Sequence, residues 1–195
     1  MEKAKASELV LLFIDASHFV MGGDFIGHAY GKIRRYIRTF SGRMRYNVLG
    51  ALNFATKQMT CVTNDTYIRA NEVCELLQKL AVEYADQPIY IVLDNARYQK
   101  CKIVQETAAQ LGIFLVYIPP YSPNLNLIER LWKHVKGRLR TKYYNSFERF
   151  KGKIDTVLSA TENEDKKAID RLISDKVQLF DNLLVVDDIL LRVAS

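Results

Sequence analysis

The stretch "QPIYIVLD" at residues 87–94 decides the fold class, because it is a short apolar run that ends in an aspartate. A run of this length, without polar alternation, is typical of a buried strand. A second run of the same kind, "ELVLLFID" at residues 8–15, also ends in an aspartate. Apolar residues at helical spacing over 66–85 lie between the two runs. Strands joined through a helix favour parallel pairing.

The other segments fit the same sheet. The runs "RYNVLGALNF" (45–54) and "KQMTCVT" (57–63) predict an antiparallel hairpin that turns at Ala55–Thr56, and "IFLVYI" (113–118) predicts a further strand. Helices are expected at 99–111, from about Leu127 to Arg140, from Ser146 onward and at about 165–180, while 16–43 is expected to be irregular and 181–195 has no assignment. The prediction is a single α/β domain of 195 residues, with a mixed sheet between helices and a helical C-terminal part at about 143–195.

Charge is distributed unevenly along the chain, whose net charge is +6. Residues 31–45 carry six Lys or Arg and no acid. Such clusters indicate either a polyanionic partner or simply a solvated basic surface. Three cysteines without a CxxC pair are interpreted as free thiols in a reducing compartment. No signal peptide or membrane-length apolar run is recognised, so a cytoplasmic location is expected.

Asp15 and Asp94 each follow an apolar run directly. In open α/β sheets, functional sites form at the carboxyl ends of strands. If the two strands are neighbours, the two carboxylates lie side by side and repel each other, and a divalent cation would relieve that repulsion. Either aspartate alone is more simply explained as a residue that caps a turn or a helix.

Glu129 has two interpretations. Asn126 is a good N-cap and Glu129 stands three residues later, as in a capping box. Alternatively, Glu129 heads a stripe of cations, Lys133, Lys136 and Arg140, opposite the apolar stripe of the same helix. A carboxylate at the head of a cationic stripe suits a site where a metal ion and a phosphate meet.

Three blocks resemble the DDE transposases of the mariner superfamily, specifically their bacterial insertion-sequence branch. They are "GRMRYNVLGALN" (42–53), "VLDNARYQK" (92–100) and "YSPNLNLIERLWKHVK" (121–136), with 34 residues between Asp94 and Glu129. The resemblance implies a ribonuclease H-like fold with a five-stranded mixed sheet. It also implies that Asp15, Asp94 and Glu129 are the catalytic residues and hold two Mg²⁺ or Mn²⁺ ions, Asp15 bridging both.

The chemistry that the resemblance implies is cleavage of DNA at transposon ends, followed by transfer of the freed 3′-hydroxyl into target DNA. The alternatives are a ribonuclease H-like nuclease without strand transfer, or an inactive DNA-binding remnant. Contacts to DNA are expected from six residues: His18, Arg97, Lys100, Lys133, Lys136 and Arg140. A homodimer on DNA and a bacterial, nucleoid-associated location are also expected.

The chain departs from the family pattern at several positions. Leu127 stands where the family usually has proline, Gln99 where many relatives have histidine, and Ala16 where glutamate is common. Relatives also carry N-terminal helix-turn-helix modules before the catalytic part. Here the first predicted strand begins within ten residues of Met1. The chain is therefore interpreted either as one half of a split reading frame, with a separately encoded or frameshift-fused helix-turn-helix part as its partner, or as a remnant or a fragment.

Overall fold

The computed structural model describes residues 8–21, 44–119, 125–139, 144–163 and 166–173. Ten elements follow one another in these residues: β1 (Val10–Met21), β2 (Met44–Asn53), β3 (Met59–Asn64), α2 (Ala70–Glu83), β4 (Ile89–Leu93), α3 (Lys102–Gln110), β5 (Ile113–Tyr117), α4 (Ile128–Leu139), α5 (Phe147–Asn163) and α6 (Lys166–Leu172). No helix among the described residues is long and apolar enough to cross a membrane.

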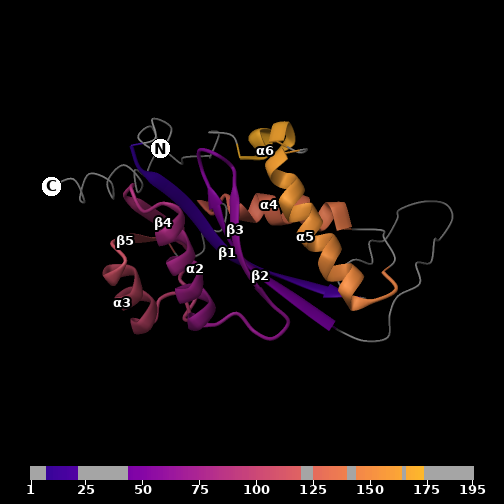
Figure 1. The fold of residues 1–195 in the computed structure, drawn as a ribbon, viewed down its shortest axis with the longest axis horizontal. Coiled ribbons are helices and arrows are strands. Elements are labelled where there is room, and N and C mark those ends of the chain that lie inside the picture. Colours follow the sequence, from indigo (N-terminus) through magenta and orange to yellow (C-terminus); the bar gives the residue numbers. More distant parts are fainter. Residues whose placement is uncertain (1–7, 22–43, 120–124, 140–143, 164–165, 174–195) are drawn as a thin grey trace.

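The five strands form one mixed sheet in the order β3-β2-β1-β4-β5 (Figure 1). β1 pairs antiparallel with β2, and β2 pairs antiparallel with β3. On its other side β1 pairs parallel with β4, and β4 pairs parallel with β5. The helical connections α2 and α3 explain the parallel half, since a crossover is needed to return the chain in the same direction. The predicted mixed five-stranded sheet between helices is confirmed.

Helices cover both faces of the sheet, and each face has its own core. On one face α2 and α3 pack over Leu12, Ile14 and Ile91. On the other face α4, α5 and α6 pack over Leu11, Phe13 and Val92. Figure 1 shows α2 and α3 on the opposite side of the strands from α4, α5 and α6. Side chains alternate between the two faces along a strand, so the odd-numbered residues of β1 point toward α4.

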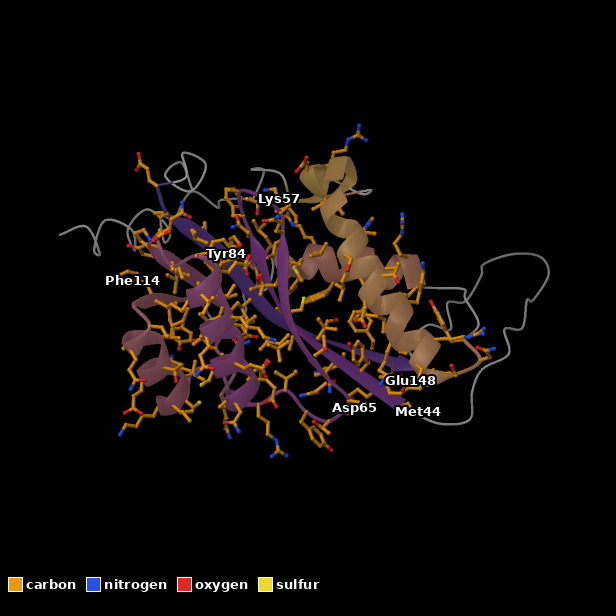
Figure 2. The ribbon with its side chains drawn as sticks, viewed as in Figure 1. Met44, Lys57, Asp65, Tyr84, Phe114 and Glu148 are labelled. Atoms are coloured by element: carbon orange, nitrogen blue, oxygen red, sulfur yellow. The ribbon has the colours of Figure 1, made fainter. Side chains whose placement is uncertain are left out.

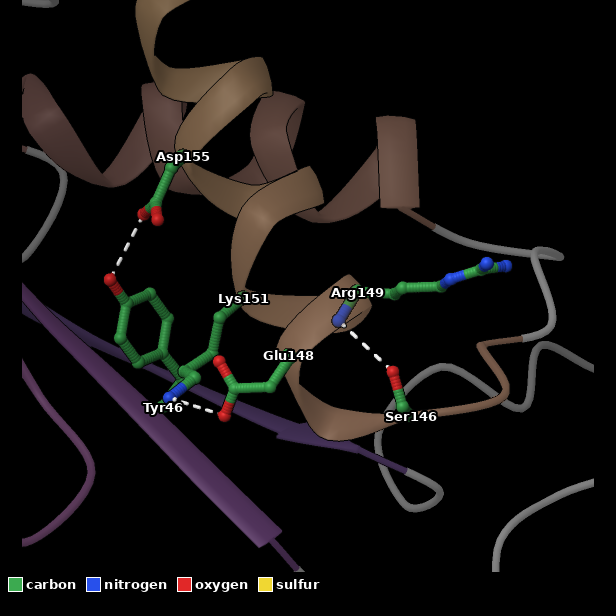
Figure 3. A network of polar contacts seen from close by, with 6 residues as sticks. All are labelled: Tyr46, Ser146, Glu148, Arg149, Lys151 and Asp155. Carbon is green, nitrogen blue, oxygen red and sulfur yellow. Dashed lines mark hydrogen bonds and ion pairs between the residues drawn. The ribbon is translucent and has the colours of Figure 1, made fainter.

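α5 is fixed to the sheet by polar contacts as well as by its apolar face. The hydroxyl of Tyr46 on β2 donates to Asp155 Oδ1 at 3.0 Å (Figure 3). At the start of the helix, the Arg149 N–H donates to Ser146 Oγ at 3.3 Å, which confirms the predicted cap. Figure 2 shows this end of α5, marked by Glu148, near Met44 and far from Phe114 on the edge strand β5.

β1 does not end at Asp15, as the sequence had predicted, but continues to Met21. The irregular segment was predicted from the glycines between 22 and 31 and from the basic cluster that follows them. An antiparallel ladder with β2 extends the strand instead, from Asp15↔Gly50 to Met21↔Met44. Backbone pairing therefore decides where β1 ends, and Asp15 lies in the middle of the strand.

Other boundaries shift by a few residues. α2 begins at Ala70 rather than 66, because the Arg69 N–H donates to the Glu72 carboxylate at 2.7 Å. α3 begins at Lys102, after a turn. The last predicted helix is described only as α6, and the rest of the expected irregular segment (22–43), residues 174–180 and the tail 181–195 lie outside the described residues. The predicted hairpin is confirmed in β2 and β3.

Candidate active site

Asp15 and Asp94 lie at the same place on neighbouring strands. Phe13 of β1 is paired with Val92 of β4, and both belong to the core beneath α4. Each aspartate stands two residues further along its own chain, and side chains two residues apart share a face. β4 ends at Leu93, whereas β1 continues beyond it. Asp15 therefore lies on β1 at the level where its parallel neighbour β4 ends.

α4 brings Glu129 to this point. Its five buried residues, Ile128, Leu131, Trp132, Val135 and Leu139, form the predicted apolar stripe and pack on the sheet. Glu129, on the first turn, is left exposed. The helix is fixed at its start by Asn126, whose buried side chain donates from Nδ2 to the main-chain oxygen of Ile14 at 3.0 Å. That bond joins the first turn of α4 to the residue before Asp15.

Of the two interpretations of Glu129, the capping box with Asn126 is not formed in the described residues. Asn126 Oδ1 accepts no hydrogen bond from the described residues, and the Glu129 N–H donates instead to the main-chain oxygen of Asn126 at 3.2 Å. The amide donates through Nδ2 to β1, and this tertiary contact turns the side chain toward the strand instead of toward the N–H groups of its own helix. Glu129 is thereby released from the role that competed with metal binding.

Close packing against β2 completes the arrangement. Gly50 is the β2 partner of Asp15. A Cβ added at Gly50 would lie 2.9 Å from Cη2 of Trp132, so only glycine lets the indole approach the strand this closely. The indole Nε1 is buried without a hydrogen bond of good geometry among the described residues. It is still near enough to Asp15 to lower the pKa of that carboxyl slightly.

The electrostatics of the three carboxyl groups are unfavourable without a cation. The pKa of Asp15 is raised from 3.8 to about 7, mainly by burial and then by the charges of Asp94 and Glu129, against the opposing hydrogen bond from the Ala16 N–H. Burial, and then Asp94, also raise the pKa of Glu129. Burial and the charges of Asp94 and Asp15 raise the pKa of the Tyr98 hydroxyl to about 12. The three carboxyl groups therefore lie within electrostatic range of one another, although they come from β1, from the residue after β4 and from α4.

A hollow of about 550 Å³ opens beside Asp15 and Glu129, while Asp94 does not line it. Its lining consists of Asp15, Ala16, Ser17, His18, Glu129, Trp132, Lys133 and Lys136. Lys133 is exposed, and the ammonium of Lys136 lies over the Phe19 ring, 5.8 Å from its centre. The hollow is thus lined by β1, with Asp15 and His18, and by α4, with Glu129 and two lysines. This arrangement suits a ligand that brings negative charge to a metal ion.

His18 is held in one orientation by the buried amide of Asn47 and, through it, by Asn64. Its Nδ1 lies 2.7 Å from Asn47 Oδ1. Asn47 Nδ2 donates to Asn64 Oδ1 at 2.9 Å and to the Thr66 oxygen at 3.0 Å, so the orientation of this amide is fixed. His18 Nδ1 must then be the donor, which leaves Nε2 as the acceptor in the neutral ring.

The six residues predicted to contact DNA lie in different places relative to the hollow. His18, Lys133 and Lys136 line the hollow. Arg97 and Lys100 are exposed on the turn after Asp94 but do not line it, and Lys100 Nζ donates to Asn95 Oδ1 at 3.4 Å. Arg140 lies outside the described residues.

Sequence reasoning had missed what Gln99 and Asn126 do. Gln99 is fully buried next to Asp94, and Asn126 is the fixing point of α4. Both are polar residues inside the core, and neither has a periodic pattern that marks it. The only available signal was the position of Gln99, where relatives of the family have another hydrogen-bonding side chain.

The sheet order, the crossovers and the position of the carboxylates define a ribonuclease H-like fold of the kind found in transposase and integrase catalytic domains. The Mos1 mariner transposase catalytic domain matches it with a TM-score of 0.62 and 14% identity, over 91% of this chain and 81% of that one. The HTLV-2 integrase catalytic core domain matches with a TM-score of 0.51 and 14% identity, over 78% and 85% of the two chains. These likenesses concern the fold.

The family follows from the sequence itself. Residues 10–151 match the family model described as DDE superfamily endonuclease, and the chain belongs to that family. The Mos1 transposase in its paired-end complex matches with a TM-score of 0.68 and 14% identity over 95% of this chain, which spans 57% of that protein's length. No curated protein matches the chain closely enough to count as a relative.

Proposed function

We propose that this domain cuts DNA phosphodiester bonds with divalent metal ions held by Asp15, Asp94 and Glu129. The observation that carries the proposal is that Asp15 and Glu129 line a hollow with two lysines, and that Asp94 is near enough to raise the pKa of both. A carboxyl group with a pKa near 7 in a cleft is typical of a functional site. The family to which the chain belongs is one of endonucleases.

The chemistry of the three residues fits a hard cation. All three supply carboxylate oxygens, the ligands that Mg²⁺ and Mn²⁺ prefer. Among the described residues no group of three His, Cys, Asp or Glu side chains is already close enough to hold an ion, so the carboxylates must draw together around it. The HTLV-2 integrase core was solved with magnesium, and the Mos1 catalytic domain with manganese. Once bound, such ions lower the pKa of an attacking water and stabilise the leaving 3′ oxygen.

The chain's own residues prepare this step. Asp15 is half-buried in the middle of β1, whereas Glu129 is exposed on a helix turn. We infer that Asp15 is the shared ligand, with Asp94 and Glu129 on either side. Lys133 and Lys136 attract the phosphate into the hollow, and His18 contacts the same strand of DNA through Nε2. Arg97, Lys100 and Arg140 bind phosphates further along the duplex.

We propose, more specifically, that the protein is a transposase, which performs strand transfer as well as cleavage. The Mos1 transposase is known in a strand transfer complex and, bound to a transposon end, in a paired-end complex. We propose the same two reactions here, on a homodimer and with a helix-turn-helix part that recognises the ends. The presence of all three carboxylates favours this over an inactive remnant. A nuclease that only hydrolyses DNA is the remaining alternative.

The test is an assay with supercoiled plasmid, a labelled duplex with free 3′-hydroxyl ends, and Mn²⁺. We expect nicking of the plasmid and joining of the duplex to it, both lost in Asp94→Asn. Asp86→Asn, which changes an exposed aspartate on a loop, is the matched control and should cut like the wild type. Nicking without joined products would leave only hydrolysis, and cutting by Asp94→Asn would overturn the proposed site.

A further inference from the structure

Gln99 is the most deeply buried polar side chain near the three carboxylates, with an exposed fraction of 0%. A buried carboxamide needs partners for its oxygen and its NH₂ group, because an unpaired buried polar group costs about 1–3 kcal/mol. The partners available to Gln99 are the carboxylate of Asp94 and the hydroxyl of Tyr98.

Only one orientation of the amide satisfies both partners. With Nε2 toward Asp94, the amide donates to Asp94 Oδ1 at 2.6 Å and to the Asp94 main-chain oxygen at 3.3 Å. Its own oxygen then accepts from the Tyr98 hydroxyl at 3.3 Å. The opposite orientation would set two oxygens 2.6 Å apart, one of them on a carboxylate, and is rejected on that ground.

The backbone of Gln99 is fixed at both ends. Its N–H donates to the Ala96 oxygen at 2.9 Å, and its carbonyl oxygen accepts from the Tyr117 hydroxyl at 3.2 Å. A carboxamide on so rigid a backbone holds its partner in place rather than following it. The turn thus connects Asp94 with the edge strand β5 through Tyr117.

Asp94 Oδ1 receives two donors from this turn. One is Gln99 Nε2 and the other is the Ala96 N–H, at 2.8 Å. No hydrogen bond from a described residue reaches Oδ2. The carboxylate is therefore held by one oxygen and keeps the other for a ligand.

We propose that Gln99 is a positioning residue, which fixes the Asp94 carboxylate through Oδ1 so that Oδ2 is presented to the metal ion. The proposal rests on the proposed metal-dependent function, and it assigns a role to a residue that touches neither metal nor DNA. Groups that hold a metal-binding carboxylate in place typically change metal affinity 10–100-fold when they are removed. A neutral amide gives this support at every pH.

The experiment is a Mn²⁺ titration by calorimetry of the whole chain, wild type against Gln99→Met, with thermal unfolding recorded for each variant. Methionine is similar in length to glutamine and has no donor. We expect its Mn²⁺ dissociation constant to be about 10–100-fold higher. The matched control is Gln105→Met, because Gln105 is an exposed glutamine whose Nε2 donates to the Lys100 oxygen at 3.0 Å, and it should bind like the wild type.

A rescue variant distinguishes a positioning role of Gln99 from a merely structural one. Gln99→His restores a ring N–H donor and should recover most of the lost affinity, whereas a role in packing alone predicts that histidine is no better than methionine. If Gln99→Met does not fold, Gln99→Asn, which withdraws the donor by one methylene, takes its place with the same expectation. Equal Mn²⁺ affinity in wild type and in a folded variant without the donor overturns the proposal, even if the wild type cuts DNA. Absence of plasmid cutting by a wild type that binds Mn²⁺ would instead overturn the proposed function.

Discussion

Asp15 is half-buried beside two other carboxyl groups, and its protonation contributes to the stability of the fold. The pKa of this carboxyl is about 7 in the native state, against an ordinary value of 3.8. The native state therefore holds the proton more tightly than the unfolded chain does. The stability that this proton provides is complete below pH 3.8 and is lost as the pH rises through 7.

We expect Asp15→Asn to stabilise the metal-free protein by roughly 1–3 kcal/mol at pH 8 and by much less at pH 4.5, because asparagine never carries the buried charge. The measurement is urea unfolding of both proteins in the presence of a chelator. The same gain at both pH values would show that the pKa of Asp15 is not raised. In the wild type, Mn²⁺ should raise the melting temperature more at pH 8 than at pH 4.5, since it binds the ionised carboxylate.

Gly50 permits the contact between Trp132 and β2. A Cβ there would lie 2.5 Å from Met59 Cε and 2.9 Å from Trp132 Cη2. Methionine can move aside, whereas the indole is held by its own packing in α4. We expect Gly50→Ala to destabilise the protein by about 1–3 kcal/mol, as measured by urea unfolding.

Gly137 provides the control for Gly50. It is an exposed glycine in α4, and a Cβ there would meet nothing within 4 Å. Gly137→Ala should therefore stabilise the protein by about 1 kcal/mol, through helix propensity alone. Changes of the same sign in both variants would contradict the close packing of Trp132 on β2.

Among the elements, α4 has the most demanding position, because it must place Glu129 beside two strands. Its apolar face sets the distance from the sheet, and Asn126 fixes its start along β1. α6 supports the same helix from the other side, where Arg130 donates to the Leu172 oxygen at 3.2 Å. The first turn of α4 is thus attached to two other elements.

We expect Asn126→Ala to cost about 1–3 kcal/mol of stability, because the buried Ile14 oxygen loses its donor. DNA cutting per folded molecule should fall as well, since the first turn with Glu129 is no longer fixed to β1. The control is Ser146→Ala, which removes the cap of α5 at a cost of about 1 kcal/mol and should leave cutting per folded molecule unchanged. Unfolding curves and plasmid nicking by the folded fraction measure both effects. Full cutting by Asn126→Ala would show that this bond does not position Glu129.

At the scale of the whole molecule, the lysines beside the candidate site and the lysine of α2 lie on opposite faces of the sheet. Lys133 and Lys136 lie on α4 beside the carboxylates. On the opposite face of the sheet, Lys79 of α2 is paired with Glu75 at 2.9 Å. Binding of a polyanion should therefore depend on Lys133 and Lys136 of α4 and not on Lys79 of α2.

We expect Lys133→Gln to weaken DNA binding and to lower the slope of log affinity against log salt by about 1, the value for one lost phosphate contact. Lys79→Gln is the matched control and should leave both quantities unchanged. Fluorescence anisotropy with a labelled duplex at several salt concentrations measures them, with Ca²⁺ in place of Mn²⁺ to prevent cutting. An unchanged slope in Lys133→Gln would remove this lysine from the DNA path.

The sequence by itself determined the fold class and most of the elements. Apolar runs of strand length and the helical spacing of α4 are local patterns, and local patterns are fixed by backbone geometry and burial. The helical spacing predicted each of the five apolar residues that α4 buries against the sheet. The three carboxylates were predicted as a set, from the ends of two apolar runs and from a family motif, and their role as metal ligands remains a prediction.

Only the tertiary structure decided how the site is held together. The true end of β1, the use of the Asn126 amide for β1 instead of a helix cap, and the hydrogen bond from Gln99 to Asp94 all depend on partners distant in sequence or on a buried turn. A polar side chain has several possible partners, and the one it takes is chosen by packing, which no local pattern records. The same reason applies to the pKa of Asp15, because burial and neighbouring charges exist only once β1, β4 and α4 have come together.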